Sequence, residues 1–145
     1  MLYQITSLFV LQGDDVLRNV YAYCNEYGIC PVLDFIKSAG KKFEKKFEFL
    51  IKYIKQEKEC LCEPYVKHFS VEKYQLLYEL RLRNNGTMIR IIFFLTGNSD
   101  IILLHAFYKK EKRDTERALE SALRILNSMD SDNTDNNERI AEVTV

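Results

Sequence analysis

The stretch that decides the fold is Gln75–Tyr108, which reads QLLYELRLRNNGTMIRIIFFLTGNSDIILLHAFY. It contains three runs rich in Ile, Leu, Phe and Tyr, most of which are residue types that strands favour. Asn85-Gly86 separates the first two runs and favours a tight hairpin, because Asn and Gly tolerate the left-handed backbone of such a turn. Gly97-Asn98 marks a second turn. The stretch therefore predicts a three-stranded antiparallel meander.

Tight turns also determine which residues lie opposite one another. If Asn85-Gly86 are the two central residues of the first turn, Arg81 faces Arg90 on the neighbouring strand. If Gly97-Asn98 form the next two-residue turn, Arg90 faces His105. We therefore expect a row of two arginines and one histidine across three strands. A slip of one residue would move His105 to the other face of the sheet.

Alternation of side chains divides the meander into two faces. One face is almost wholly apolar and should pack under helices; it comprises Tyr78, Leu80, Leu82, Ile89, Ile91, Phe93, Ile102, Leu104 and Ala106. The other face mixes charged and apolar side chains, namely Arg81, Arg83, Arg90, His105, Leu77, Ile92, Phe94, Leu103 and Phe107. We interpret the mixed face as a shallow cleft with a polar centre.

The row of like charges calls for a counter-charge. Like charges directly opposite each other destabilise a sheet by up to about 1 kcal/mol, so a bound phosphate would relieve the repulsion between Arg81 and Arg90. Alternatively, Glu79 on the same face neutralises one arginine, and His105 only forms a hydrogen bond in the core. The presence of all three residues in one row favours an anion-binding site.

Further elements are predicted on both sides of the meander. Pro31 favours the first turn of a helix and Gly40 favours a helix end, and apolar residues recur every three or four positions in two later segments. We expect a strand in Val16–Cys24 and helices over Val32–Ala39, Lys41–Lys58 and 114–128. The fold class is thus α+β: a small antiparallel sheet, made of the meander and an N-terminal strand, packs against two N-terminal helices and a C-terminal helix.

Length and charge indicate one basic domain with an acidic end. A chain of 145 residues is about one domain long. Residues 17–128 hold 20 Lys and Arg against 14 Asp and Glu, a net charge of +6, whereas residues 129–145 carry −4. The basic part suits a phosphate-rich partner, although such an excess is also found on ordinary solvated surfaces. We predict an N-terminal extension over 1–16, the domain over 17–128 and a disordered acidic tail over 129–145.

The composition disfavours several other classes. No run approaches the roughly 18 apolar residues of a membrane-spanning helix, and the apolar Leu2–Leu11 segment lacks the features of a secretory signal. We therefore expect a cytoplasmic protein with no membrane partner. Of the four cysteines, Cys60 and Cys62 are too close together for a usual zinc knuckle. We expect reduced, partly buried thiols, and neither a metal nor a small-molecule cofactor.

Several motifs follow one another in a fixed order along the chain: PVLDFI (31–36), LYELRLR (77–83), IRIIFF (89–94), ILLHAFYKK (102–110) and ERAL (116–119). This ordered set resembles the RelE/HigB toxin superfamily, specifically the phage-derived HigB-like branch of type II toxin–antitoxin systems, over roughly residues 17–128. Ile89 stands where that branch usually has Tyr. The segment after Lys110 also lacks the common Thr-Pro and is a few residues shorter.

The resemblance implies a RelE-like fold and a toxin that acts as a ribosome-dependent mRNA endonuclease, inhibiting translation. In such cleavage the ribose 2′-hydroxyl attacks the adjacent phosphodiester, and no metal is required. The implied partners are mRNA on the ribosome and a cognate helix-turn-helix antitoxin encoded beside the toxin.

The resemblance also implies roles for individual residues. Arg81 and Arg90 would stabilise charge on the phosphoryl oxygens, because a guanidinium grips phosphate in a bidentate manner. His105 would act as the acid or base, with neighbouring arginines lowering its pKa towards the neutral form. Four further residues would bind RNA, and the last two of them could instead supply a general acid: Lys67, Arg83, Lys109 and Lys110.

Two other functions fit the same scaffold. One is a non-catalytic ParE-like poison of DNA gyrase, which has no need for His105 beside an arginine pair. The other is an inactive relative that only binds its antitoxin or DNA.

Overall fold

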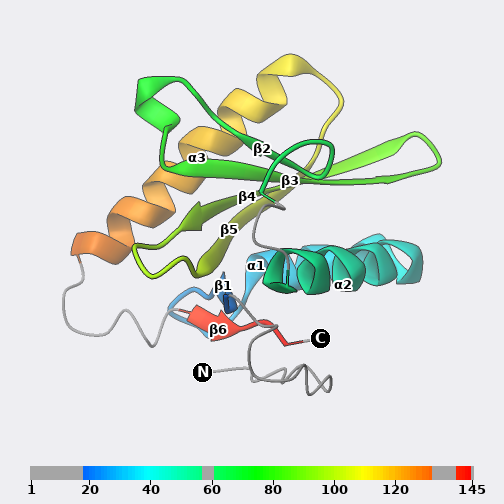
Figure 1. Ribbon diagram of the computed structural model, residues 1–145, viewed down its shortest axis with the longest axis horizontal. Helices are drawn as coiled ribbons and strands as arrows, with labels where there is room; N and C mark the ends of the chain where they lie inside the picture. Colours follow the sequence, from blue (N-terminus) through cyan, green and yellow to red (C-terminus); the bar gives the residue numbers. More distant parts are fainter. Residues whose placement is uncertain (1–17, 57–60, 132–139, 145) are drawn as a thin grey trace.

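The computed structural model describes residues 18–56, 61–131 and 140–144, and shows an α+β domain (Figure 1). In chain order the elements are β1 (Val20–Tyr23), α1 (Pro31–Ala39), α2 (Lys41–Gln56), β2 (Val66–His68), the short 3-10 helix η1 (Glu72–Tyr74), β3 (Leu77–Asn84), β4 (Thr87–Leu95), β5 (Ile101–Tyr108), α3 (Lys112–Ser131) and β6 (Ile140–Glu142). The predicted α+β class, the meander and the three helices are confirmed.

The sheet is mixed, not purely antiparallel as expected. Its strand order is β2-β3-β4-β5-β1-β6. The meander strands and β2 pair antiparallel, whereas β1 lies parallel to β5. A parallel neighbour requires a crossover connection, and the segment from α1 to β4 supplies it here. The sequence pattern predicted β1 but did not fix its direction.

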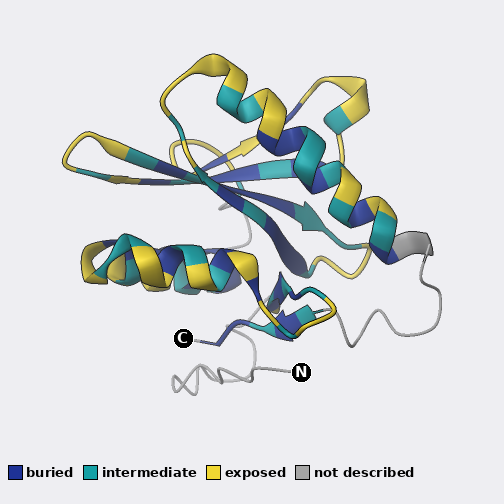
Figure 2. Cartoon of the chain, turned by 180° about the vertical axis from the view of Figure 1, so that it is seen from behind, coloured by how far each residue is buried: buried dark blue, intermediate teal, exposed yellow. Residues whose placement is uncertain are grey.

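Two helical layers enclose the sheet. Pro31 begins α1 and Gly40, with a φ of 102°, follows its end. Together α1 and α2 cover one face of the sheet, and α3 crosses the other (Figure 1). The central strands are therefore buried between the layers, while the β3–β4 turn projects into solvent (Figure 2).

The β3–β4 hairpin has the predicted register. Asn85 and Gly86 both have a positive φ, at 48° and 81°, as a tight hairpin turn of this type requires. Arg81 lies opposite Arg90. Local turn chemistry was enough to fix this pair.

The β4–β5 register differs from the prediction, so Arg90 does not face His105. The connection is a five-residue loop, Thr96–Asp100, instead of a two-residue turn, and the Thr96 N–H donates to the Asp100 carbonyl at 2.8 Å. Arg90 lies opposite Phe107, and His105 lies opposite Ile92.

A β-bulge accounts for the rest of the difference. Ile92 pairs with His105 but the next residue, Phe93, pairs with Leu103, which leaves Leu104 as an extra residue. Because the loop is longer than predicted, the first half of β5 is turned over relative to the prediction. Ile102 and Leu104 pack on the α3 side of the sheet, and Leu103 packs on the α1–α2 side. The bulge then reverses this change, so that His105 is on the expected face after all.

The C-terminal tail is not wholly disordered as predicted. Ile140–Glu142 forms β6 beside β1, and Ala141 and Val143 are fully buried. The buried amine of Lys55 on α2 donates to the Val143 carbonyl at 2.6 Å. Apolar residues in an otherwise polar segment thus complete the sheet edge. The remaining tail residues, 132–139 and 145, and the predicted extension 1–16 lie outside the described residues.

The expectation of reduced thiols is wrong for two of the four cysteines. Cys24 and Cys30 form a disulfide, with their Cα atoms 4.0 Å apart. The turn between them brings the thiols together, because the Asn25 side chain accepts hydrogen bonds from the backbone N–H groups of Tyr27 and Ile29. Cys62 is exposed and is not part of this disulfide, and Cys60 lies outside the described ranges. Spacing alone did not reveal this proximity.

Candidate functional site

Three cross-strand rows of side chains lie on the side of the sheet that faces α3. We call the surface that these three rows form the cationic face. From the sheet interior towards the β3–β4 turn, the rows are Lys67–Glu79–Ile92–His105, Arg81–Arg90–Phe107 and Arg83–Met88–Lys109. These rows bring together six of the seven residues predicted for the site. Lys110 lies beyond the end of β5.

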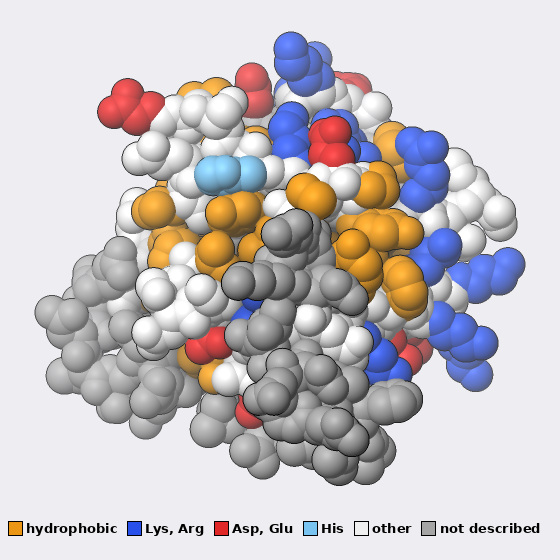
Figure 3. Space-filling view, viewed as in Figure 1, with side chains coloured by type: hydrophobic (Ala, Val, Ile, Leu, Met, Phe, Trp, Pro, Cys, Tyr) orange, Lys and Arg blue, Asp and Glu red, His pale blue; other side chains and the backbone are white. Residues whose placement is uncertain are grey.

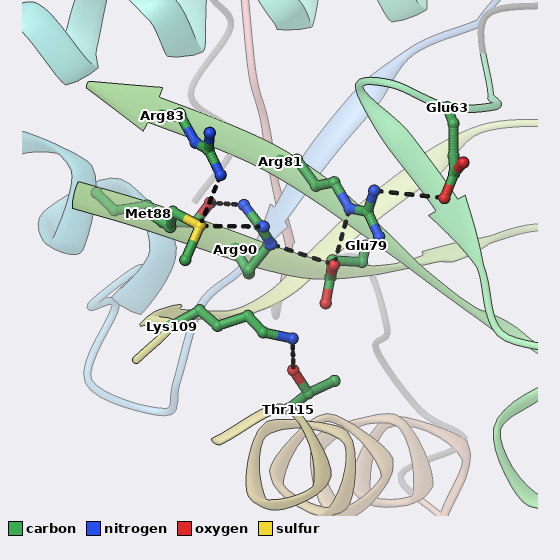
Figure 4. Close-up of polar contacts among 9 residues, drawn as sticks. Glu63, Glu79, Arg81, Arg83, Met88, Arg90, Lys109 and Thr115 are labelled. Carbon is green, nitrogen blue, oxygen red and sulfur yellow. Dashed lines mark hydrogen bonds and ion pairs between the residues drawn. The ribbon is translucent and has the colours of Figure 1, made fainter. Parts of the chain in front are cut away.

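A buried carboxylate lies between the two facing arginines. Glu79 is only 2% exposed, and its Oε1 atom is 3.2 Å from Arg81 Nε and 3.3 Å from Arg90 Nε (Figure 4). One alternative from the sequence was that Glu79 neutralises one arginine; the structure places Glu79 against both arginines. The exposed carboxylate of Glu63 lies 3.4 Å from Arg81 Nη1. Neither carboxylate was predicted to be part of the site, although strand alternation alone places Glu79 on the same face as Arg81.

The third arginine gives the cluster a net positive charge. Arg83 and Arg90 both donate to the sulfur of Met88, at 3.2 and 3.6 Å. Among the described residues, Arg83 contacts no carboxylate and Arg90 contacts none besides Glu79. Burial is the main cause that lowers the pKa of Arg90. The charge of Glu79 raises this pKa, whereas the charges of Arg81 and Arg83 lower it further. Arginine nevertheless stays protonated at neutral pH. The three guanidiniums outnumber the two carboxylates that contact them, Glu79 and Glu63, which leaves a local excess of positive charge.

His105 shares the cationic face but lies one pair further along the sheet. Diagonal neighbours of this kind are about 7–8 Å apart between Cα atoms, so Arg90 and His105 are near one another without being opposed. The ring stacks at 6.1 Å on Phe107. A pocket of about 180 Å³ between β5 and α3 reaches it, lined also by Asp114 and Arg117. The alternative in which His105 only forms a hydrogen bond in the core is not observed, because the ring makes no hydrogen bond among the described residues.

The pKa of His105 is lowered as expected, but for a different reason. Burial is the main cause, and the charge of Arg124 on α3 adds to it. The arginines of the facing strands are not the cause. The imidazole is therefore held in its neutral form at neutral pH, and in that form it can accept a proton.

The three predicted lysines differ in their contacts. Lys109 donates to Thr115 at the start of α3 (3.0 Å), while its backbone N–H pairs with Met88. Lys110 is exposed, and its backbone N–H donates to Asp114. The backbone N–H of Glu111 donates to the same carboxylate, and the hydrogen bonds from Glu111 and Lys110 lower the pKa of Asp114. Lys67 is exposed, with its amine 5.4 Å from the ring of Phe69.

Within the described ranges, no cluster of three or more His, Cys, Asp or Glu side chains could hold a metal ion. None of the helices there has the length and apolar character to cross a membrane.

The fold and a match to a known family identify the class of protein. A mixed six-stranded sheet with three helices is consistent with the RelE-like fold. Residues 34–127 match the family described as Phage derived protein Gp49-like (DUF891). The match covers more than half of the chain, so the protein belongs to this phage-derived family, which is a RelE/HigB-like toxin family. Among curated proteins, no match was found.

Proposed function

We propose that this protein is the toxin of a type II toxin–antitoxin pair and cuts mRNA on the translating ribosome. The observation that carries the proposal is the cluster of Arg81, Arg83 and Arg90, whose three positive charges exceed the two negative charges of Glu79 and Glu63 that contact it. Membership of a toxin family supports the same function. The proposed partners are ribosome-bound mRNA and a cognate helix-turn-helix antitoxin.

The proposed reaction uses the substrate's own nucleophile. The ribose 2′-oxygen bonds to phosphorus as its proton leaves, the bond from phosphorus to the 5′-oxygen breaks, and that oxygen gains a proton. The products are a 2′,3′-cyclic phosphate and a 5′-hydroxyl. Arg81 and Arg90 would hold the phosphoryl oxygens, which carry increased negative charge in the transition state.

Proton transfer is assigned to residues beside the arginines. His105 is neutral near pH 7 and would take the proton of the 2′-hydroxyl. Lys109, at the end of the same strand, or Lys110 would donate to the leaving oxygen, and Lys67 and Arg83 would hold flanking phosphates. The basis for these assignments is the diagonal arrangement of Arg90 and His105, which would let both side chains contact one phosphodiester.

Induced expression in a bacterial host tests the proposal. The wild-type chain should arrest growth, and primer extension on cellular mRNA should show cuts at codon-spaced positions. Arg90→Ala and His105→Ala should abolish both effects. Because Arg90→Ala leaves Glu79 with one arginine fewer, Arg90→Lys serves as a second variant that keeps the charge but loses the bidentate grip. Folding is checked by thermal unfolding of each purified variant.

Arg113→Ala is the matched control. Arg113 is an exposed arginine of α3 that pairs with Glu111 away from the arginine cluster, so this variant should remain toxic. Full toxicity of folded His105→Ala and Arg90→Ala would refute the site assignment.

Two observations favour a non-catalytic function instead. Glu79 partly neutralises the facing arginines, and His105 is half-buried beside α3. A ParE-like gyrase poison or an inactive relative that only binds antitoxin or DNA would tolerate this arrangement. A gyrase poison would arrest growth without mRNA cuts and would accumulate cleaved DNA, whereas an inactive relative would not arrest growth.

A further inference from the structure

We propose that a pocket beside the arginine cluster binds one nucleotide of the RNA strand next to the cleaved bond, with its base stacked on Phe49 and Tyr65. This inference rests on the proposed function, because it extends the same RNA site around the edge of β3. Neither aromatic residue was among the predicted site residues.

The pocket lies where β3 continues beyond its neighbour. β2 pairs with β3 only along Tyr78–Leu80, and the Arg81 N–H then donates to the Tyr65 carbonyl at 2.8 Å. Past this point a pocket of about 400 Å³ opens between α2 and β3, and its lining includes Lys46, Phe49, Tyr65, Arg81, Arg83 and Arg90. A volume of this size is in the range of small-molecule sites.

Aromatic rings form one wall of the pocket and are unusually open to solvent. Phe49 is 55% exposed and Tyr65 is 37% exposed. Their centroids are 6.2 Å apart, and each ring also contacts Tyr53, at 6.3 and 5.5 Å. The two exposed rings are therefore braced by a third. Exposed rings of this kind are what proteins use to stack the bases of single-stranded nucleic acid.

Cations form the rest of the pocket's border. Lys46 approaches from α2, and the arginines approach from the β3–β4 hairpin. Figure 3 shows hydrophobic side chains gathered between α2 and the hairpin, with Lys and Arg side chains around them. An apolar peptide would offer no counter-charge to Lys46 and Arg83, neither of which pairs with a carboxylate among the described residues. A nucleotide supplies both a flat ring and a phosphate, so its chemistry matches both parts of the pocket.

The pocket is continuous with the proposed catalytic site. Arg81 and Arg90 line the pocket and also contact Glu79 on the cationic face. A strand whose phosphate lies at these arginines can therefore place its neighbouring base against Phe49. Glu63, which pairs with Arg81 at the surface, would be displaced by that phosphate.

Binding of a single strand that cannot be cleaved tests the pocket separately from catalysis. The probe is a fluorescein-labelled 2′-O-methyl RNA pentanucleotide, which lacks the attacking hydroxyl, and fluorescence anisotropy gives its Kd. Phe49→Ala and Tyr65→Ala should each weaken binding by about 5- to 150-fold, the range of one lost base stack. Tyr27→Ala is the control, because Tyr27 is 79% exposed in the turn before α1, and it should bind as the wild type does.

Two further measurements sharpen the test. The chain has no tryptophan, so Phe49→Trp introduces a unique fluorophore, which should keep the affinity and be quenched by the probe. A probe with an abasic residue at the stacked position should bind the wild type and Phe49→Ala equally.

Undiminished probe binding by Phe49→Ala, or absence of quenching in Phe49→Trp, would overturn the pocket assignment. So would a Phe49→Ala variant that binds the probe normally but has lost affinity for the antitoxin, because the pocket would then be a protein-docking surface. If mRNA is not cut but probe binding depends on Phe49, the pocket assignment survives and the nuclease proposal fails.

Discussion

Arg90 contacts Glu79 at a distance of 3.3 Å, in a pair where the arginine side chain is 11% exposed and the carboxylate 2% exposed. The same carboxylate oxygen accepts a hydrogen bond from Arg81. A charge at this depth is tolerated only with a partner. Glu79 therefore makes it possible for two arginines to face each other across the hairpin without a ligand.

Glu79→Gln should destabilise the fold strongly. The change leaves Arg90 buried without a counter-charge, and breaking a buried ion pair costs about 3–5 kcal/mol. Urea unfolding at neutral pH measures the free energy of unfolding. The control is Glu63→Gln, which removes the exposed partner of Arg81 and should cost less than about 1 kcal/mol. Equal effects of the two changes would contradict the role given to burial.

The stability of the protein should fall as the pH drops below about 6.5, the ordinary pKa of histidine. The pKa of His105 is lowered in the folded state by burial and by Arg124, so the unfolded chain binds this proton more readily. Stability from this group is complete above pH 6.5 and decreases below it.

Urea unfolding between about pH 5 and pH 7.5 should show this slope in the wild type and a weaker slope in His105→Gln. The lowered pKa of Asp114 affects stability only at more acidic pH, so Asp114 does not cause the slope in this range. NMR titration of a His68→Gln variant, in which His105 is the only histidine left, gives the pKa directly. A value at or above 6.5 would be evidence against the predicted shift.

Lys55 and the C-terminal strand should be energetically coupled. Lys55→Ala leaves the Val143 carbonyl without its donor, which should cost about 1–3 kcal/mol. In a chain truncated after residue 139 the same change should cost much less, because the contact is already gone. Lys45→Ala, at an exposed position on α2, should change stability by less than about 0.5 kcal/mol. Equal costs of Lys55→Ala in both backgrounds would argue against the contact.

Gly86→Ala should destabilise the hairpin that aligns the arginines. Gly86 has a φ of 81° with nothing near an added Cβ, so the cost is that of the left-handed backbone alone, about 1–2 kcal/mol. Gly97→Ala is a matched control, since that site is equally open and has no positive φ. It should be neutral or slightly stabilising. Thermal unfolding compares the two variants, and a larger loss for Gly97→Ala would contradict this account.

Elements fixed by local chemistry were predictable. Asn85 and Gly86 specify a turn through their own backbone preferences, so the opposition of Arg81 and Arg90 followed. Regular apolar spacing likewise predicted the helices. The position of His105 opposite Ile92 did not follow, because the loop length and the bulge at Leu104 depend on how β5 packs against both helical layers.

The meander, its cationic face and the family motifs all follow from the amino-acid sequence alone, because these features depend on residues close together in the chain. Only the tertiary structure decided the remainder: the parallel β1, the strand β6, the Cys24–Cys30 disulfide and the pocket beside Phe49. Each of these joins segments whose encounter depends on the packing of the whole domain or on the path of a loop, and such contacts leave no periodic signal in the sequence.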